Sequence, residues 1–165
     1  MFILASDTGN DYDEVRRGYA AYREYLQANE KRFPPGAYAL ATSSWYFDFT
    51  DHRCPHDGWL EEMRLTEKTS PEEPRQRVAE MTVRLLGAYH DLYVEFTYPR
   101  VYRYELALTD GEWGHRDWRY DELRLSDEGH LIHEIEWCGP TDTARWQIVA
   151  SDVLFRIEPI DQPEP

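Results

Sequence analysis

The hydrophobic pattern of this chain changes its period once, at Pro34-Pro35-Gly36, and this change constrains the fold class. Before it, apolar residues recur every three or four positions, as on one face of an α-helix: Val15, Tyr19, Tyr22 and Leu26. After it, apolar and polar residues alternate, which indicates strands with one buried face. The sequence therefore predicts one long helix followed by a sheet.

The predicted helix covers residues 11–32. Asp11 is a suitable N-cap, and Glu14 three residues later would complete a capping box. Asp13 adds negative charge where the helix dipole favours it. The two prolines and the glycine that follow end the helix.

The segments after the helix have the composition of strands and are separated by turn residues. They lie near residues 38–49, 59–67, 78–86, 92–98, 101–108, 120–125, 131–137 and 146–157, the last with a bend near Ser151-Asp152. Ser126-Asp127-Glu128-Gly129-His130 reads as a hairpin turn, so strands should be neighbours in order. We expect an α+β fold: one N-terminal helix packed on a strongly curved antiparallel sheet or partial barrel of about seven or eight strands in mostly sequential order.

The length of 165 residues is that of one domain. We expect residues 1–158 to form it. Pro159, Pro163 and Pro165 indicate a flexible tail over residues 159–165, because proline cannot donate to a β-ladder.

The charge of the chain restricts its partners. With 18 Lys and Arg against 32 Asp and Glu, the formal net charge is −14. Such a chain repels nucleic acid and anionic membranes, whereas a basic protein would be attracted. Small acidic α+β proteins include immunity proteins that neutralise basic toxin domains. That similarity is one of composition and assigns no residues.

The cellular setting is inferred from the cysteines and the first residues. The apolar start, Met1 to Ala5, is too short for a signal peptide, and no apolar run reaches membrane-spanning length. Cys54 and Cys138 are too few for a disulfide framework. These features favour a cytoplasmic location.

The segment 51–57 concentrates potential metal ligands. Zinc binds imidazole and thiolate, and His52, Cys54 and His56 lie within five residues, with Cys138 as the best fourth ligand. In an extended strand the two histidines would be about 13 Å apart, so the segment would have to curl. A turn with solvated histidines is the alternative interpretation. If zinc binds, a nearby carboxylate could activate water, as in a metal-dependent hydrolase.

The segment 110–119 is the candidate binding loop, because it holds two tryptophans and two glycines among charged residues. Exposed Trp and Arg often dominate interfaces, and the same pair can stack on a small ligand. The predicted contact residues are Trp113, His115, Arg116, Trp118 and Arg119. Alternatively, one or both tryptophans fold back over the sheet.

No complete catalytic motif is found. His133 alternates with apolar residues and is expected to be a hydrogen-bonded core histidine, whereas Glu134 and Glu136 fall on the wet face of the same strand. No serine lies in a glycine-flanked elbow, and no glycine-rich phosphate loop joins a strand to a helix. The sequence therefore favours a non-catalytic protein without cofactor, binding a protein partner or a small apolar ligand. The zinc-dependent hydrolase remains the alternative.

Overall fold

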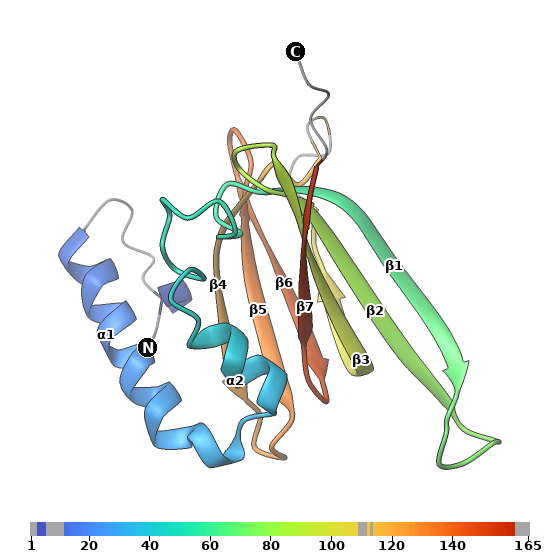
Figure 1. Cartoon of the computed structure of the whole chain (residues 1–165). Coiled ribbons are helices and arrows are strands. Elements are labelled where there is room, and N and C mark those ends of the chain that lie inside the picture. Colours follow the sequence, from blue (N-terminus) through green and yellow to red (C-terminus); the bar gives the residue numbers. More distant parts are fainter. Residues whose placement is uncertain (1–2, 6–11, 109–111, 113, 161–165) are drawn as a thin grey trace.

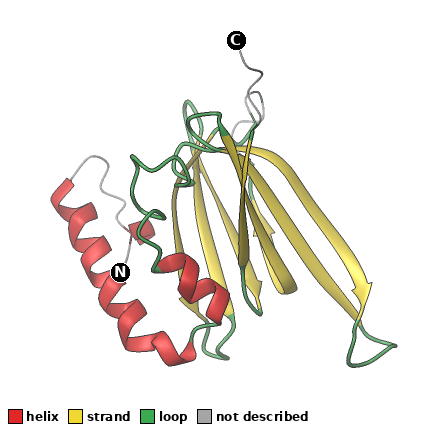
Figure 2. Ribbon diagram, viewed as in Figure 1, coloured by secondary structure: helices red, strands yellow, loops and turns green. Residues whose placement is uncertain are grey.

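The helices lie on one side of a single, strongly curved antiparallel sheet (Figures 1 and 2). The computed structural model describes residues 3–5, 12–108, 112 and 114–160. The class is α+β, as predicted. The helices are a short 3-10 turn, Ile3–Ala5, then α1, Tyr12–Asn29, with a 3-10 extension at Glu30–Arg32, and α2, Pro35–Ala41.

Helix α1 forms where the apolar periodicity predicts it, and tyrosine hydroxyls attach it to the sheet. The Tyr22 hydroxyl donates to the carbonyl oxygen of Leu123 at 3.0 Å and accepts from the Leu123 amide at 2.8 Å. One turn later, Tyr25 accepts from the Leu125 amide at 2.8 Å. The helix therefore follows one strand closely. The predicted N-cap, Asp11, lies outside the described residues.

The strand predicted over residues 38–49 is wrong, because this segment begins within α2 and continues in turns. Pro35 occupies the first turn of α2, where its fixed φ angle suits a helix. The apolar residues of α2 are buried at helical spacing: Ala37, Leu40 and Ala41. Aromatic residues after α2 gave the segment a strand-like composition that its backbone does not follow.

The N-terminus of α2 is capped by a residue distant in sequence. Asp152 accepts hydrogen bonds from the amides of Gly36 at 3.1 Å and Ala37 at 2.8 Å. Gly36 permits this approach, since an added Cβ would lie 2.3 Å from the Val153 carbonyl oxygen. The cap thereby ties α2 to the segment between the last two strands.

Within the described residues, seven strands form the sheet. They are β1 Trp59–Thr69, β2 Arg77–Leu86, β3 Leu92–Leu106, β4 Asp117–Leu125, β5 Leu131–Cys138, β6 Thr143–Ala150 and β7 Leu154–Pro159. The predicted strands 92–98 and 101–108 are one strand, β3, and the last predicted strand divides into β6 and β7 at the expected bend. Strand β7 includes Pro159, the first residue of the expected tail, and residues 161–165 lie outside the described part.

The strands are hydrogen-bonded in a ring. The order is β2-β1-β4-β5-β6-β3-β7, and β2 also pairs with β3. Hairpin neighbours pair as predicted, but β3 pairs with β6 and β7, and β1 meets β4 only at Trp59 and Asp117. The sheet is therefore curved almost into a barrel, with sequential order only in part.

The core lies on the inner face of this ring and includes three fully buried tryptophans. Alternate residues from β2 to β6 supply it, among them Met81, Val83, Val94, Phe96, Leu123, Ile135, Trp118, Trp137, Trp146 and Ile148. Two charged or titratable side chains on this face, Asp121 and His133, are also buried. Because buried polar groups require hydrogen-bond partners, Asp121 and His133 must be hydrogen-bonded within the core.

Replacing Asp152 by Ala should lower the free energy of unfolding by about 1–2 kcal/mol, because the amides of Gly36 and Ala37 lose their acceptor. Asp152→Asn, which keeps one oxygen, should cost less. Urea denaturation followed by tryptophan fluorescence measures both. The matched control is Asp142→Ala, since Asp142 is exposed in a turn. Equal stability of the Asp152→Ala and Asp142→Ala variants would contradict the capping role.

Candidate functional site

The predicted binding loop is divided between surface and core. Trp113 lies outside the described residues. Trp118 is a core residue rather than the expected surface side chain: it is fully buried and its indole N–H donates to Asp121 at 3.0 Å. Strand β4 begins at Asp117 and turns this indole inward, where its burial is favourable. Arg119 lies on β4, 3.6 Å from a carboxylate oxygen of Glu136.

His115 and Arg116 contribute to a hollow where the ring closes. It has a volume of about 330 Å³ and is lined by Trp59, Leu60, Glu61, Gly114, His115 and Arg116. Burial lowers the pKa of His115, whose ring lies 4.8 Å from that of Trp146, and a backbone hydrogen bond with Ala107 acts in the opposite direction. The structure therefore brings two predicted binding residues beside Trp59, which sequence analysis had assigned only to a strand.

Backbone strain surrounds Trp59. The non-glycine residues with positive φ are Asp57 at 61°, His90 at 57° and Arg116 at 59° among the described residues. The Trp59 side chain is 42% exposed, its ring centroid lies 4.8 Å from that of His90, and its N–H donates to Asp117. Strained conformations persist only where their surroundings hold them, and they gather at functional sites.

The predicted metal ligands have separate partners. His52 Nδ1 lies 2.6 Å from a carboxylate oxygen of Asp91, and the His52 ring stacks on Tyr89. The His56 ring packs against Phe49 in a tilted arrangement, 3.9 Å between centroids. The Cys54 thiol is buried and donates to the Tyr46 carbonyl oxygen at 3.1 Å.

The predicted ligands do not form a metal-binding centre. Burial raises the pKa of Cys54 to about 12, which keeps the thiol protonated at neutral pH. Cys138 lies at the end of β5 and contacts the Gly139 carbonyl oxygen. In the described part of the chain, no group of three or more His, Cys, Asp or Glu could hold a metal ion. The structure does not bring His52, Cys54, His56 and Cys138 together.

A buried hydrogen-bond network is centred on the Asp121 carboxylate. One oxygen accepts from the Tyr46 hydroxyl at 2.5 Å and lies 3.0 Å from His133 Nε2, and the other accepts from the Trp118 indole. His133 Nδ1 lies 2.7 Å from the Tyr98 hydroxyl. All these groups are satisfied when Tyr98 donates to Nδ1 and Nε2–H donates to Asp121.

The tyrosines of this network are protonated donors. Burial raises the pKa of Tyr46 well above its ordinary value, and the Asp121 carboxylate raises it further. Burial does the same for Tyr98, again with a contribution from Asp121. Because Asp121 and His133 are only 3% and 0% exposed, this network is enclosed in the core. The histidine predicted to be structural is therefore hydrogen-bonded on both ring nitrogens.

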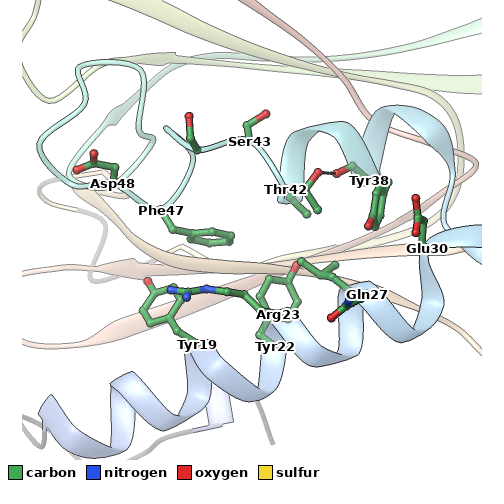
Figure 3. Close-up of a pocket in the computed structure, with 13 residues that line it drawn as sticks. Tyr19, Tyr22, Arg23, Gln27, Glu30, Tyr38, Thr42, Ser43, Phe47 and Asp48 are labelled. Carbon is green, nitrogen blue, oxygen red and sulfur yellow. Dashed lines mark hydrogen bonds between the residues drawn. The ribbon is translucent and has the colours of Figure 1, made fainter.

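A groove with a volume of about 560 Å³ lies between α1, α2 and the segment after α2 (Figure 3). Four aromatic side chains line it: Tyr19, Tyr22, Tyr38 and Phe47. The other lining residues are Arg23, Leu26, Gln27, Glu30, Ala41, Thr42, Ser43, Ser44 and Asp48. Its lining thus combines flat apolar surfaces with both signs of charge.

Phe47 connects the groove to the buried network. Its ring meets those of Tyr19 and Tyr22 edge-on, with centroids 5.4 and 5.8 Å apart. It also packs on Tyr46, 4.8 Å away, which is bonded to Asp121. The Phe47 side of the groove is therefore held in position by the hydrogen-bonded network in the core.

Sequence reasoning missed this groove because it assigned the whole of 38–49 to a strand and Tyr19 and Tyr22 only to a core face. A local signal did exist. Pro35 followed by the alanine-rich run to Ala41 is compatible with a helix start. Ser43 and Ser44, next to that run, would then have been recognised as residues at a helix end.

No protein-family model, curated protein or solved structure matches this chain. Within its described residues, the chain contains no helix that is long and apolar enough to cross a membrane. We therefore infer its function from the geometry of the two hollows and of the buried network.

Replacing Tyr46 by Phe should lower the free energy of unfolding by about 1–3 kcal/mol, because the ring is kept while the buried Asp121 carboxylate loses a donor. Chemical denaturation measures the change. Tyr104→Phe is the matched control, since Tyr104 is 46% exposed. If both variants lose the same small amount of stability, Tyr46 does not sustain the network.

Proposed function

We propose that this chain is a non-catalytic binding protein and that the groove between α1 and α2 holds a small molecule with a flat apolar part. The observation that carries the proposal is a hollow of about 560 Å³ with four aromatic side chains and a few polar groups in its lining. Ligand sites typically have volumes of about 300–1,000 Å³ and this mixture of surfaces.

The distribution of acid–base groups favours binding over catalysis. The histidine–carboxylate network of Asp121 and His133 is enclosed in the core, where a substrate cannot reach it. Of the carboxylates in the groove, Asp48 is hydrogen-bonded by the hydroxyl and amide of Thr50, which lowers its pKa. Asp48 is therefore an ordinary ionised acceptor, suited to orienting a ligand.

The groove is also held in shape before any ligand arrives. Tyr22 is hydrogen-bonded to both backbone groups of Leu123, and Phe47 is packed against Tyr46. Aromatic walls that do not need to be ordered on binding reduce the entropic cost of association.

The test is binding of aromatic fragments such as naphthalene alcohols, monitored by chemical-shift changes in isotope-labelled protein. We expect the changes to concentrate on the groove residues and Gln27→Trp to weaken binding by about tenfold or more, because the new ring fills the groove. Glu24→Trp is the matched control, since Glu24 is also exposed on α1 but does not line the groove. Unchanged binding to Gln27→Trp would contradict this site.

A second candidate function, contact with a protein partner, is favoured by the surface around Trp59. Its exposed aromatics include Trp59 at 42% and Tyr89 at 49%, and three strained backbone positions adjoin them. Trp and Tyr are prominent among residues that dominate interfaces. A net charge of −14 would speed encounter with a basic protein.

For this second function, immobilised chain should retain a specific protein from native lysate, and the variant Trp59→Ala/Tyr89→Ala should lose most of it. Quantitative mass spectrometry of the retained proteins measures the effect. Met63→Ala on β1 serves as control, because Met63 is also 42% exposed but lies further along the strand. Identical retention by all three proteins would exclude the Trp59 surface as the contact.

A further inference from the structure

Among the described residues that line the groove, one side chain is cationic, Arg23. Figure 3 shows it extended along α1 toward Tyr19, and its charge acts on the Tyr19 hydroxyl. No ion pair of Arg23 is found among the residues that the structure describes. In the same acidic chain, Arg124 and Arg145 each approach two carboxylates. The guanidinium in the groove is thus available to a ligand.

The two carboxylates of the groove lie apart from this guanidinium. Figure 3 shows Glu30 at the end of the groove where Tyr38 lies. Asp48 lies on the segment after Phe47, and one of its oxygens accepts from the Thr50 amide at 3.0 Å and hydroxyl at 2.7 Å. Neither is within ion-pair distance of Arg23. The described lining of the groove therefore has one positive charge, on Arg23, and its negative charges lie elsewhere, on Glu30 and Asp48.

We propose that the ligand of the groove is an aromatic carboxylic acid, with its ring against Tyr19 and Phe47 and its carboxylate on Arg23. This inference rests on the proposed small-molecule function. A guanidinium binds a planar carboxylate through two parallel hydrogen bonds. Gln27 follows Arg23 by four residues on α1, so its amide can donate from the same helix face.

The carboxylates of Glu30 and Asp48 favour a carboxylate ligand over a phosphate ligand. A phosphate monoester carries close to two negative charges at neutral pH. Glu30, Asp48 and the net charge of −14 oppose the second of these charges. A single carboxylate presents only the charge that Arg23 can neutralise. The geometry therefore favours a monoanion, with Glu30 and Asp48 free to accept from ligand hydroxyls.

The experiment compares naphthoate with naphthamide, its neutral isostere, by isothermal titration calorimetry on the full chain at neutral pH and physiological salt. Wild-type protein should bind naphthoate about tenfold or more tightly than naphthamide, because naphthoate accepts the guanidinium hydrogen bonds with a charged carboxylate and naphthamide with a neutral carbonyl oxygen. Arg23→Gln should abolish this preference, because it weakens naphthoate binding far more than naphthamide binding. Arg17→Gln is the matched control, since Arg17 is exposed on α1 outside the groove.

A charge-reversal variant should gain affinity for a cationic probe, which a variant that is only partly unfolded would not do. Arg23→Glu should bind naphthylmethylammonium more tightly than wild-type protein does. Equal affinity of wild-type protein for naphthoate and naphthamide, or a preference that survives Arg23→Gln, would overturn the carboxylate inference while groove binding stands. Tighter binding of naphthyl phosphate than of naphthoate would overturn it too. Failure of both naphthoate and naphthamide to bind would remove the proposed function itself.

Discussion

The rest of the structure depends on how the buried Asp121 carboxylate is satisfied. An ionised carboxylate at 3% exposure would cost several kcal/mol without compensating donors. Its donors come from three places in the chain: Tyr46 after α2, Trp118 on β4 and His133 on β5, with Tyr98 of β3 behind the histidine. All must be in place together, so one polar group sets the relative positions of three strands and the segment after α2. Apolar packing alone would tolerate more arrangements.

The same network gives the groove its shape. Tyr46 is held by Asp121 from inside, and Phe47, the next residue, turns its ring outward against Tyr19 and Tyr22 of α1. Helix α2, which supplies the other wall, is held by Asp152 from the connection between β6 and β7. The groove is therefore built by contacts between segments far apart in sequence. Its lining owes little to local propensity.

The sequence predicts those elements whose hydrophobic period is long and uninterrupted, and fails where a distant contact decides. Helix α1 and strands β1, β2, β4 and β5 follow from their periods. Residues 92–98 and 101–108 were predicted as two strands, yet β3 continues through Pro99 and changes partner, from β7 over residues 92–97 to β6 over residues 101–106. Helix α2 is only seven residues long and its cap is Asp152, more than one hundred residues away. Neither the local sequence around α2 nor its composition predicts the contact with Asp152.

Clustering in sequence was a poor guide to clustering in space. His52, Cys54 and His56 are separated by single residues, but the chain turns between them and each side chain finds its own partner. Asp121 and His133 are twelve residues apart and meet because β4 and β5 pair with their inner faces in common. The usable signal was a titratable residue within a run of alternating apolar residues, as at His133. A side chain in that position must have a buried partner. Which residue becomes that partner depends on the register between β4 and β5, and this register is seen only in the structure.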